Sequence, residues 1–278
     1  MICYLILHYQ NFEVTCNCVD RVLQKSRPDS RVLIVDNASP NGSGIWLMQH
    51  YADENKVIIL RNSENEGFSR GNNRGYEYIR NHFKPECVVV MNNDVLIEQD
   101  SFEDMLLKYA KEMPFAVIGP DIVNIKGCHQ NPMLQGTYSS RRLLKQFLID
   151  CWRICLYSAQ SGGKSLPAVN DVRCRNRPRT LPGCVLHGAC LILFSQFIRN
   201  EKFVFPPKTF LYGEEFLFFD YLKYRGYRWA YVEELSVLHL CGASTGMTPA
   251  SNLVRKLILY NKARVQIIKA RITKKYNW

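Results

Sequence analysis

The sequence predicts an α/β protein built on a mostly parallel sheet flanked by helices. In residues 1–120, short apolar runs rich in β-branched residues alternate with longer stretches of helical periodicity. Repeated strand–helix–strand units with short links favour a parallel sheet with right-handed crossovers. Two of the apolar runs stop abruptly at carboxylates or amides, as strands do beside the ligand site of such a sheet.

Four strands and four helices are expected in this first part. The strands are expected at residues 2–8, 31–36, 56–60 and 87–91. The helices are expected at residues 12–25, from the turn at 38–44 to about 54, from a polar loop to about 83, and at 102–112. Ser101 is expected to cap the last helix, with Asp104 where an acidic side chain helps.

The alternation breaks near Gly127. Residues to about 182 are irregular, basic and aromatic, with one clear helical stretch at 141–157. Further strands are expected at 185–194, 229–232 and 237–239, and a helix is expected at 214–225, ended by Gly226. The tail carries apolar residues close to one helical stripe, at positions 253, 257, 260, 265, 268 and 272.

The overall composition is that of a folded protein, with 47% hydrophobic and 22% charged residues. The first apolar run lacks a basic leader and a small-residue cleavage site, and no run has the length that spans a bilayer. We therefore expect a cytoplasmic protein. Its eleven cysteines include no CxxC pair, so we expect reduced core residues rather than zinc ligands.

The net charge of +11 is concentrated in two segments. Residues 141–179 carry nine Lys and Arg against two acids, and residues 251–278 carry eight and no acid. Nucleic-acid binding is one explanation, but the charge is localised and the aromatic residues form no RNA-binding motif, so we expect no nucleic-acid partner. The C-terminal stripe either contacts an anionic membrane surface, with Trp152 and Tyr157 as further interfacial residues, or packs on the protein.

Polar side chains follow two of the predicted strands. Asp36 ends the second strand, and Asn92, Asn93 and Asp94 end the fourth. Carboxyl ends of parallel strands meet at one edge, where ligands of open α/β sheets bind. These groups are therefore candidates for holding a substrate and a metal ion. The competing interpretation is that Asp36 starts an Asx-turn and that residues 92–94 form a polar turn.

Residues 62–75 form a polar segment that leads into a helix, with four asparagines, two glycines at 71 and 75, and Arg70. Backbone amides at a helix start, with Arg70 beside them, suit a diphosphate. A polar loop with an N-cap is the alternative. Gly71 and Gly75 each cost a helix about 1 kcal/mol, which indicates that a neighbouring element approaches closely there.

Six motifs then occur in order: residues 35–39, 65–73, 92–94, 187–189 and 210–215, and His239 with Gly242. Together they resemble the family 2 glycosyltransferases of the GT-A fold, particularly the bacterial rhamnosyltransferase-like and surface-polysaccharide branch. The resemblance implies a Rossmann-like GT-A domain over residues 1–245. It divides this domain into a nucleotide-binding half (1–120) and an acceptor-side half (121–245) with a basic insertion (about 135–180), followed by a basic amphipathic helix (246–278).

The resemblance implies an inverting transferase that moves a sugar from a UDP- or dTDP-linked donor to a saccharide hydroxyl. The implied acceptor is a lipid-linked oligosaccharide of capsule or O-antigen synthesis, reached in the cytoplasm or at the inner face of the cell membrane. The residues implied at the nucleotide-sugar are Tyr9, Asp36, Asn65, Arg70, Asn92 and Asn93, and those at a divalent metal ion are Asp94 and His239.

The metal motif departs from the family pattern. The family's DXD motif carries two acids, whereas Asn92 replaces the first here and leaves Asp94 as the one carboxylate. An amide oxygen can still ligate Mg²⁺ or Mn²⁺, with substrate phosphates supplying much of the coordination. By itself, His239 is better explained as a core or turn histidine, and its place in the ordered series of motifs reverses that preference. The missing acid makes an inactive nucleotide-sugar-binding subunit the alternative function.

Residues 210–215 match the family segment that carries an acid pair at the head of a helix. One carboxylate there deprotonates the acceptor hydroxyl, and adjacent helical residues point about 100° apart, so only one of the two acids can do so. The alignment favours Glu215, with Glu214 as an acceptor contact or second choice. Acids also favour a helix N-terminus without any catalytic role. Leu217 replaces another acid common in relatives, and His187 is expected to shape the acceptor side without being catalytic.

Overall fold

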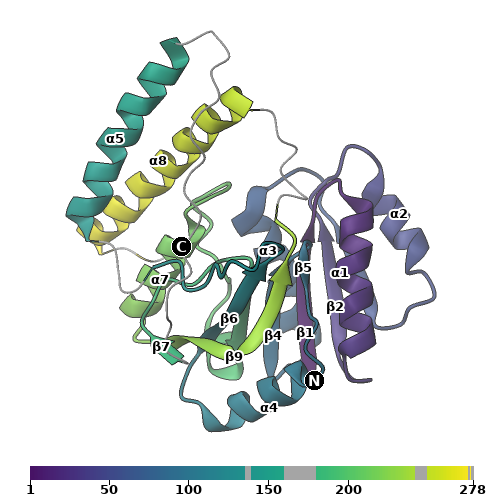
Figure 1. Ribbon diagram of the computed structural model, residues 1–278. Helices are drawn as coiled ribbons and strands as arrows, with labels where there is room; N and C mark the ends of the chain where they lie inside the picture. Colours follow the sequence, from purple (N-terminus) through teal and green to yellow (C-terminus); the bar gives the residue numbers. More distant parts are fainter. Residues whose placement is uncertain (135–138, 160–179, 242–248, 275, 277–278) are drawn as a thin grey trace.

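The structure is a computed structural model that describes residues 1–134, 139–159, 180–241, 249–274 and 276. These residues form one central sheet with helices on both faces (Figure 1). Within the described part, the strand order is β3-β2-β1-β4-β8-β6-β9-β5, and β7 pairs with β9. The predicted α/β architecture is confirmed. Gly242 and most of the basic insertion lie outside the described residues.

The first half of the sheet is parallel, as predicted. Its strands are β1 (Ile2–His8), β2 (Arg31–Asp36), β3 (Val57–Arg61) and β4 (Cys87–Asn92). The helices between them are α1 (Phe12–Lys25), α2 (Ser43–His50) and α3 (Gly67–His82). The register pairs His8 with Asp36 and Leu7 with Asn92, so the predicted polar groups end their strands at the same edge.

Successive residues of the strands feed two separate cores. On β1, Ile2, Tyr4 and Ile6 pack in the core that contains residues of α1, α2 and α4. Cys3 and Leu5 pack in the core that contains residues of α3, α6 and α7. Because side chains alternate across a sheet, a continuous apolar run is what a strand covered on both faces requires.

The second half of the sheet is mixed. β8 (Cys190–Phe194) runs antiparallel between β4 and β6 (Val117–Asn124), and β6 runs parallel to β9 (Trp229–His239). Short strands β5 (Val95–Leu96) and β7 (Thr180–Pro182) pair antiparallel with β9. The helices of this half are α4 (Phe102–Glu112), α6 (Ser195–Asn200) and α7 (Glu214–Tyr224). The sequence did not predict β5, β6, β7 or α6.

Strand β9 is continuous, whereas the sequence predicts two short strands with a turn between them. Its pairing with β6 is irregular, because Pro120 lies opposite Val232 and the next residue, Asp121, lies opposite Ser236. The residues that the register skips include the exposed Glu233 and Glu234. A bulge of this kind interrupts the apolar pattern without ending the strand.

Two local predictions had different outcomes. A Cβ atom at Gly75 would lie 2.2 Å from Leu5 Cδ1, and one at Gly71 would lie 2.7 Å from Leu7 Cδ1, which confirms that α3 approaches β1 closely. Ser101 does occupy the N-cap position of α4, but its side chain makes no capping hydrogen bond there, so the predicted capping interaction is wrong. Its hydroxyl faces Met105 Sδ instead.

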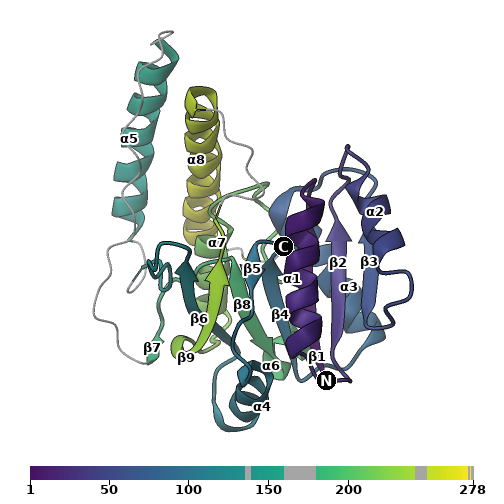
Figure 2. The same ribbon diagram turned by 45° about the vertical axis from the view of Figure 1, so that its right-hand side comes forward.

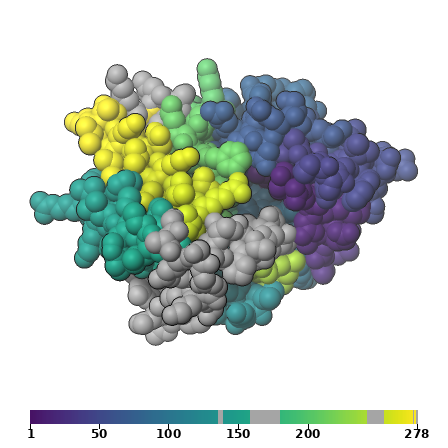
Figure 3. All heavy atoms as spheres, turned by 90° about the horizontal axis from the view of Figure 1, so that it is seen from above, coloured from purple at the N-terminus to yellow at the C-terminus, as the bar shows by residue number. Residues whose placement is uncertain are grey.

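Two long helices, α5 (Ser140–Ala159) and α8 (Pro249–Thr273), lie side by side and rise to one side of the sheet (Figures 1 and 2). Seen from above, they lie opposite the N-terminal strands and helices (Figure 3). Leu143 of α5, Leu217 of α7 and Ile267 of α8 form a shared buried cluster. The C-terminal helix therefore packs on the protein. No helix in the described part is long and apolar enough to cross a membrane.

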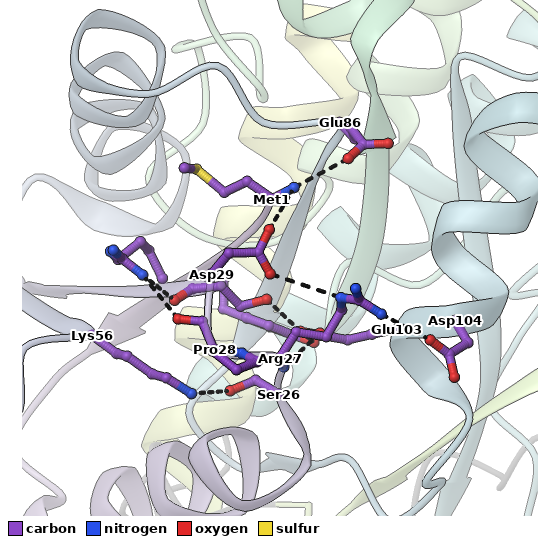
Figure 4. Close-up of polar contacts among 12 residues, drawn as sticks. Met1, Ser26, Arg27, Pro28, Asp29, Lys56, Glu86, Glu103 and Asp104 are labelled. Atoms are coloured by element: carbon purple, nitrogen blue, oxygen red, sulfur yellow. Dashed lines mark hydrogen bonds and ion pairs between the residues drawn. The ribbon is translucent and has the colours of Figure 1, made fainter.

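The amino edge of the sheet, where β1, β2 and β4 begin, is closed by a polar network (Figure 4). At its centre is the buried carboxylate of Glu103, which accepts hydrogen bonds from Tyr4 Oη (2.8 Å), Ser30 Oγ (2.9 Å) and the Arg27 amide (2.8 Å). Ion pairs of Arg27 with Asp29 and Asp104 surround it. Ten cysteines fall in the described residues and all are free thiols, as expected.

Candidate active site

The carboxyl edge of the sheet, where β1, β2, β3 and β4 end, begins with Asp36. Its carboxylate is fully buried. Oδ1 accepts the Ser39 amide at 3.0 Å, and Oδ2 lies 3.4 Å from Arg61 Nε. The bond to Ser39 is the turn interaction that the sequence left open. A Cβ atom at Gly44 would lie 1.8 Å from Oδ2, so the start of α2 closes tightly over the carboxylate.

Arg61 is a site residue that the sequence reasoning missed. It ends β3 directly beside Asp36 in the parallel register, and its side chain is 44% exposed. The signal was available, because Arg61 is another polar residue at the end of a predicted strand. Asp36 and Arg61 together offer one acceptor group and one charged donor group to a ligand at this edge.

The turn after β1 lies beside Asp36. Tyr9 is half-buried, and the next residue, Gln10, adopts a positive φ of 66°. The Gln10 amide donates to Ser39 Oγ, and its carbonyl accepts from Asn41 Nδ2, both at 2.8 Å. Tyr9 is therefore carried by a turn that is fastened to the loop after β2, at the same edge as Asp36.

Asn37 organises the loop that precedes α3. Its Nδ2 donates to Asn65 Oδ1 (2.9 Å) and to the Gly67 carbonyl (3.1 Å). Its Oδ1 accepts from Asn62 Nδ2 (3.0 Å) and from the Glu66 amide (3.1 Å). One buried amide thus fixes residues 62–67, and Asn65 has a clear role in that loop.

The start of α3 differs from the predicted diphosphate cradle. The Gly67 amide donates to Asn65 Oδ1 and the Phe68 amide donates to the Phe210 carbonyl, so both amides already have acceptors within the protein. Arg70 is exposed and lines a hollow with Glu66 and Arg74 of the same segment, and Asp36, Asp94 and His239 do not line it. The segment instead contacts the loop at Phe210.

The two asparagines before Asp94 differ in burial and in their hydrogen bonds. Asn92 is half-buried at the end of β4, and its backbone N–H donates to the Ala189 carbonyl at 2.9 Å. Asn93 is buried, and its Nδ2 donates to Thr15 Oγ1 at 2.9 Å. The same hydroxyl lies 2.7 Å from His8 Nδ1. Asn93 is therefore tied into the protein below the edge, which is not the placement expected of a residue that contacts a nucleotide-sugar.

His8 belongs to this buried chain of contacts. Its Nε2 lies 2.8 Å from Ser43 Oγ at the start of α2. Burial lowers the pKa of His8 to about 4, although the charge of Asp36 acts in the opposite direction. The imidazole is therefore neutral at ordinary pH and links β1, α1 and α2 beneath the site.

Asp94 and His239 meet as the sequence predicts. Both are buried, and His239 Nε2 lies 3.2 Å from Asp94 Oδ1. They are brought together because β5 pairs with the end of β9, where Val95 lies opposite His239. Oδ1 of Asp94 has no hydrogen-bond donor within the described residues, although the ring nitrogen is near it.

The proton positions explain that missing hydrogen bond. His239 Nδ1 lies 2.6 Å from Gln130 Oε1, an acceptor, which assigns the ring proton of a neutral imidazole to Nδ1. Nε2 then carries no proton, so a lone pair of Nε2 and a lone pair of Asp94 Oδ1 point toward each other. Such a pair is stabilised by a cation that both atoms share.

A divalent metal ion fits this pair. Two adjacent ligands of an octahedral ion at about 2.1 Å are about 3.0 Å apart, close to the separation of these two atoms. No group of three or more His, Cys, Asp or Glu side chains suited to a metal occurs in the described part of the chain. The protein therefore offers two strong donors, with the half-buried Asn92 nearby in the chain.

The turn at residues 187–189 connects this pair to the acid pair on α7. The Ala189 amide donates to His187 Nδ1 at 3.0 Å, so the proton of the neutral ring is on Nε2. The His187 and His239 rings lie 5.7 Å apart. Burial, and then the neighbouring His239, lower the pKa of His187 to about 4.

Gly188, in the middle of this turn, contacts the acid pair. A Cβ atom there would lie 2.9 Å from Glu215 Oε1. Burial raises the pKa of Glu215, while backbone amides at Glu215 itself, Gly188 and Gly213 act in the opposite direction. Glu215 is the less buried of the two acids.

Glu214 has a different environment. It is buried, and Oε2 has no hydrogen-bond partner within the described residues. Burial, and then the charge of Glu215, raise its pKa well above the usual range. Of the pair, Glu215 is the better candidate for an ionised base, because amides favour its charged form.

The C-terminal helix adds aromatic residues beside these acids. The rings of Tyr260 on α8 and Tyr212 stack with centroids 5.1 Å apart. Burial raises the pKa of Tyr260, and the charge of Glu215 raises it further. Lys256 Nζ lies 5.1 Å from the centre of the Tyr212 ring. The sequence placed Tyr260 on an apolar stripe and gave no sign of this role.

Comparisons with known proteins agree with this architecture. The model of the family described as "Glycosyl transferase family 2" matches residues 4–163. The low-salt glycan biosynthesis hexosyltransferase Agl10 of Haloferax volcanii is 25% identical over 138 residues, 48% of this chain and 41% of that protein. The chain therefore spans less than half the length of that relative.

Two solved structures share the fold. GalNAc-T7, crystallised with UDP, GalNAc and Mn²⁺, superimposes with a TM-score of 0.60 and 11% identity over 93% of this chain and 47% of that chain. Residues 1–349 of TarS from S. aureus, in complex with UDP, superimpose with a TM-score of 0.54 and 12% identity over 100% of this chain and 72% of that chain. At these identities the likeness is one of fold, and it is to GT-A glycosyltransferase structures.

Proposed function

The chain belongs to glycosyltransferase family 2, and from this premise we propose that it is an inverting, metal-dependent glycosyltransferase. In the proposed reaction, a sugar passes from a UDP- or dTDP-linked donor to a hydroxyl of a saccharide acceptor. The anomeric C–O bond to the diphosphate breaks, a C–O bond to the acceptor oxygen forms, and the hydroxyl proton passes to a carboxylate of the protein.

One observation carries the proposal. A pair of side chains suited to a metal ion, Asp94 and His239, lies on one side of the turn at residues 187–189, and Glu215, a carboxylate suited to act as a base, lies on the other side. Asp94 and His239 face each other at 3.2 Å, the His239 ring contacts His187, and Gly188 is packed against Glu215. A group that holds the leaving diphosphate and a group that accepts a proton are what a direct displacement needs at its two ends.

On the donor side, Asp36 and Arg61 would contact the nucleobase, with Tyr9 on the adjoining turn. Asn92 and the pair of Asp94 and His239 would face the diphosphate. A divalent ion held by this pair would supply positive charge to the leaving diphosphate. With two strong protein donors, the protein's own contribution to this site is to fix His239 through Gln130 and to leave Asp94 Oδ1 without a hydrogen-bond donor among the described residues.

On the acceptor side, Glu215 would accept the proton of the attacking hydroxyl. Its amide contacts favour the ionised carboxylate, whereas Glu214 stays protonated through burial and through the charge of Glu215. A protonated Glu214 can donate a hydrogen bond to an acceptor hydroxyl. The stacked rings of Tyr212 and Tyr260 would form an apolar wall for a sugar ring.

For the acceptor, we propose a lipid-linked oligosaccharide of surface-polysaccharide synthesis, such as capsule or O-antigen, with the protein at the inner face of the cell membrane. The name of the Haloferax volcanii relative, a hexosyltransferase of glycan biosynthesis, supports a role in glycan assembly. The basic pair of helices α5 and α8 supports a site near an anionic surface.

A second candidate function is an inactive subunit that binds a nucleotide-sugar. The single carboxylate of the 92–94 motif favours it, because no group of three strong metal donors occurs in the described residues. Such a subunit would bind a nucleotide without transferring or hydrolysing any donor sugar.

Thermal denaturation with UDP, dTDP and their sugars, each with and without Mn²⁺, tests donor binding. A ligand of the folded state raises the melting temperature by mass action. We expect a metal-dependent rise with one nucleotide in the native protein and none in Asp94→Ala. Transfer from the donor so identified separates the two candidates. Binding without transfer would support the inactive subunit, and no rise with any nucleotide would contradict both.

A further inference from the structure

The outer face of α5 carries a continuous apolar stripe. The residues exposed along this face are Leu144 (51%), Leu148 (59%), Trp152 (64%) and Leu156 (37%). Their spacing of four residues places them on one side of the helix. The stripe is about 18 Å long, since twelve residues rise by about 1.5 Å each. Singly exposed apolar residues are common, but four in a row on one face are a patch.

The opposite face of α5 is used for packing on α8. Asn261 Nδ2 lies 3.4 Å from the Phe147 carbonyl and 3.5 Å from Cys151 Sγ. The buried Asp150 pairs with Arg264 Nη1 at 2.6 Å. Because these contacts fix which side of α5 faces the protein, the apolar stripe is turned outward. Figures 1 and 2 agree that α5 is the outer helix of the pair.

Basic residues accompany the stripe. Arg141 and Lys145 are exposed and lie on the same side of the helix as Leu144 and Leu148. Together, α5 and α8 contain ten Lys and Arg residues and one acid, the buried Asp150. Eight of the ten are exposed, whereas Arg264 and Arg271 are half-buried and pair with Asp150 and Asp220. The surface of the helix pair is therefore strongly positive and offers apolar side chains beside its charges.

We propose that the outer stripe of α5, made of Arg141, Leu144, Lys145, Leu148, Trp152 and Leu156, docks on an anionic lipid membrane. A helix with leucine and tryptophan between lysine and arginine binds at the boundary between headgroups and acyl chains. Anionic headgroups complement the charge of the helix pair. A second copy of the chain does not, because two such faces would bring like charges together.

The position of α5 gives the docking a purpose. Helix α8 lies between α5 and α7, and α7 begins with Glu214 and Glu215. Two packed helices span about 20 Å, so a membrane on α5 lies about that far from the acid pair. A saccharide carried on a lipid could reach Glu215 from that surface. This part of the inference rests on the proposed function, whereas lipid binding itself does not.

Cosedimentation of the full chain with vesicles tests the docking. We expect binding to phosphatidylcholine vesicles that contain phosphatidylglycerol, and little binding to phosphatidylcholine alone. Leu148→Ser with Trp152→Ser should lower the partition constant by about tenfold or more. The matched control is Trp46→Ser, because Trp46 is a 48% exposed tryptophan on α2 and should leave lipid binding unchanged.

Charge variants test the contribution of the basic residues to membrane binding. Arg141→Gln with Lys145→Gln should weaken binding about fivefold for each charge removed, and added salt should reduce the difference. Lys108→Gln with Lys111→Gln on α4 removes the same charge from another exposed helix and should have no such effect.

Three results would overturn the proposal: no binding to anionic vesicles, equal binding to neutral vesicles, or a native dimer that Trp152→Ser converts to a monomer. Each variant should keep its melting temperature and its nucleotide-induced stabilisation. Loss of lipid binding with intact nucleotide binding is therefore distinguishable from failure of the proposed function.

Discussion

The two edges of the sheet treat buried carboxylates in opposite ways. At the amino edge, Glu103 receives three hydrogen bonds, all between 2.8 and 2.9 Å (Figure 4). At the carboxyl edge, Asp94 Oδ1 is buried without a hydrogen-bond donor within the described residues. An unsatisfied buried oxygen costs about 1–3 kcal/mol. The comparison indicates that the amino edge holds the fold together and that the carboxyl edge is arranged for a ligand.

The largest contrast is expected from removing the base. Glu215→Gln should lower the turnover number by about 10²–10⁴, because the amide cannot accept the hydroxyl proton. The melting temperature should stay close to that of the native protein, since the substitution keeps the shape of the side chain. Steady-state transfer with the donor found by thermal denaturation measures the effect. Undiminished turnover in this variant would rule out Glu215 as the base.

The reverse result is expected at the amino edge. Glu103→Ala removes the acceptor of two buried hydroxyls and one part-buried amide and should lower the free energy of unfolding by about 4 kcal/mol. Turnover per folded molecule should be unchanged, because Glu103 lies at the other end of the sheet. Urea denaturation and an activity assay corrected for the folded fraction measure the two quantities. A loss of turnover without a loss of stability would contradict the division between the edges.

The carboxyl edge should also be sensitive to acid. The pKa values of His8 and His187 are about 4 in the folded protein, against 6.5 for an exposed imidazole. In the folded protein these lowered pKa values favour the neutral rings. The free energy of unfolding is therefore highest above about pH 6.5, and it falls as the pH falls from 6.5 toward 4. Because of each ring, the free energy of unfolding should be about 2 kcal/mol lower at about pH 5 than at about pH 7.

Denaturation of the native protein and of His8→Gln at both pH values isolates one of these rings. The variant should lose less stability on acidification than the native protein does, whatever the other titrating groups contribute. Equal losses in the two proteins would show that the His8 ring is not held neutral by burial.

The smallest effect is expected from the exposed part of the amino edge. Arg27 is half-exposed and pairs with Asp104 at 3.3 Å and with Asp29 at 3.7 Å. Arg27→Gln keeps the backbone amide that bonds Glu103 and should change the free energy of unfolding by less than about 1 kcal/mol. Urea denaturation measures this change. If the loss of free energy of unfolding were comparable with that of Glu103→Ala, the ion pairs rather than the Glu103 hydrogen bonds would be the main stabilising contacts of this edge.

The sequence predicted the parallel half of the sheet well because three of its strands, β1, β2 and β4, are buried on both faces and read as unbroken apolar runs. It did not predict β6, which contains Gly119, Pro120 and Asp121, residues that are uncommon in strands. It divided β9 at Glu233 and Glu234, because a bulge and a turn give the same local pattern. These elements depend on pairing partners far away in the chain.

The candidate site shows the same division. Asp36, Asp94, Glu215 and His239 were predicted because they stand at strand ends or in recognisable motifs. The structure places them at one edge, and their roles stay predictions. Arg61 and Tyr260 were missed because their roles arise from the register of β3 and from the packing of α8. Arg70 and Asn93 were predicted to contact the donor, but the first points outward and the second is bonded to Thr15.

The turn at residues 187–189 has a consequence for how two substrates would influence each other. It contacts His239 on one side and Glu215 on the other, and Asn131 holds it from behind through the His187 amide. If the proposed donor and acceptor bind on its two sides, a ligand that shifted one side would strain the other, and occupancy of the two subsites would be linked. Linkage of this kind is reciprocal: whatever factor the donor adds to the affinity for the acceptor, the acceptor returns to the donor. The three residues of this turn, 187–189, would thus set the cooperativity between donor binding and acceptor binding.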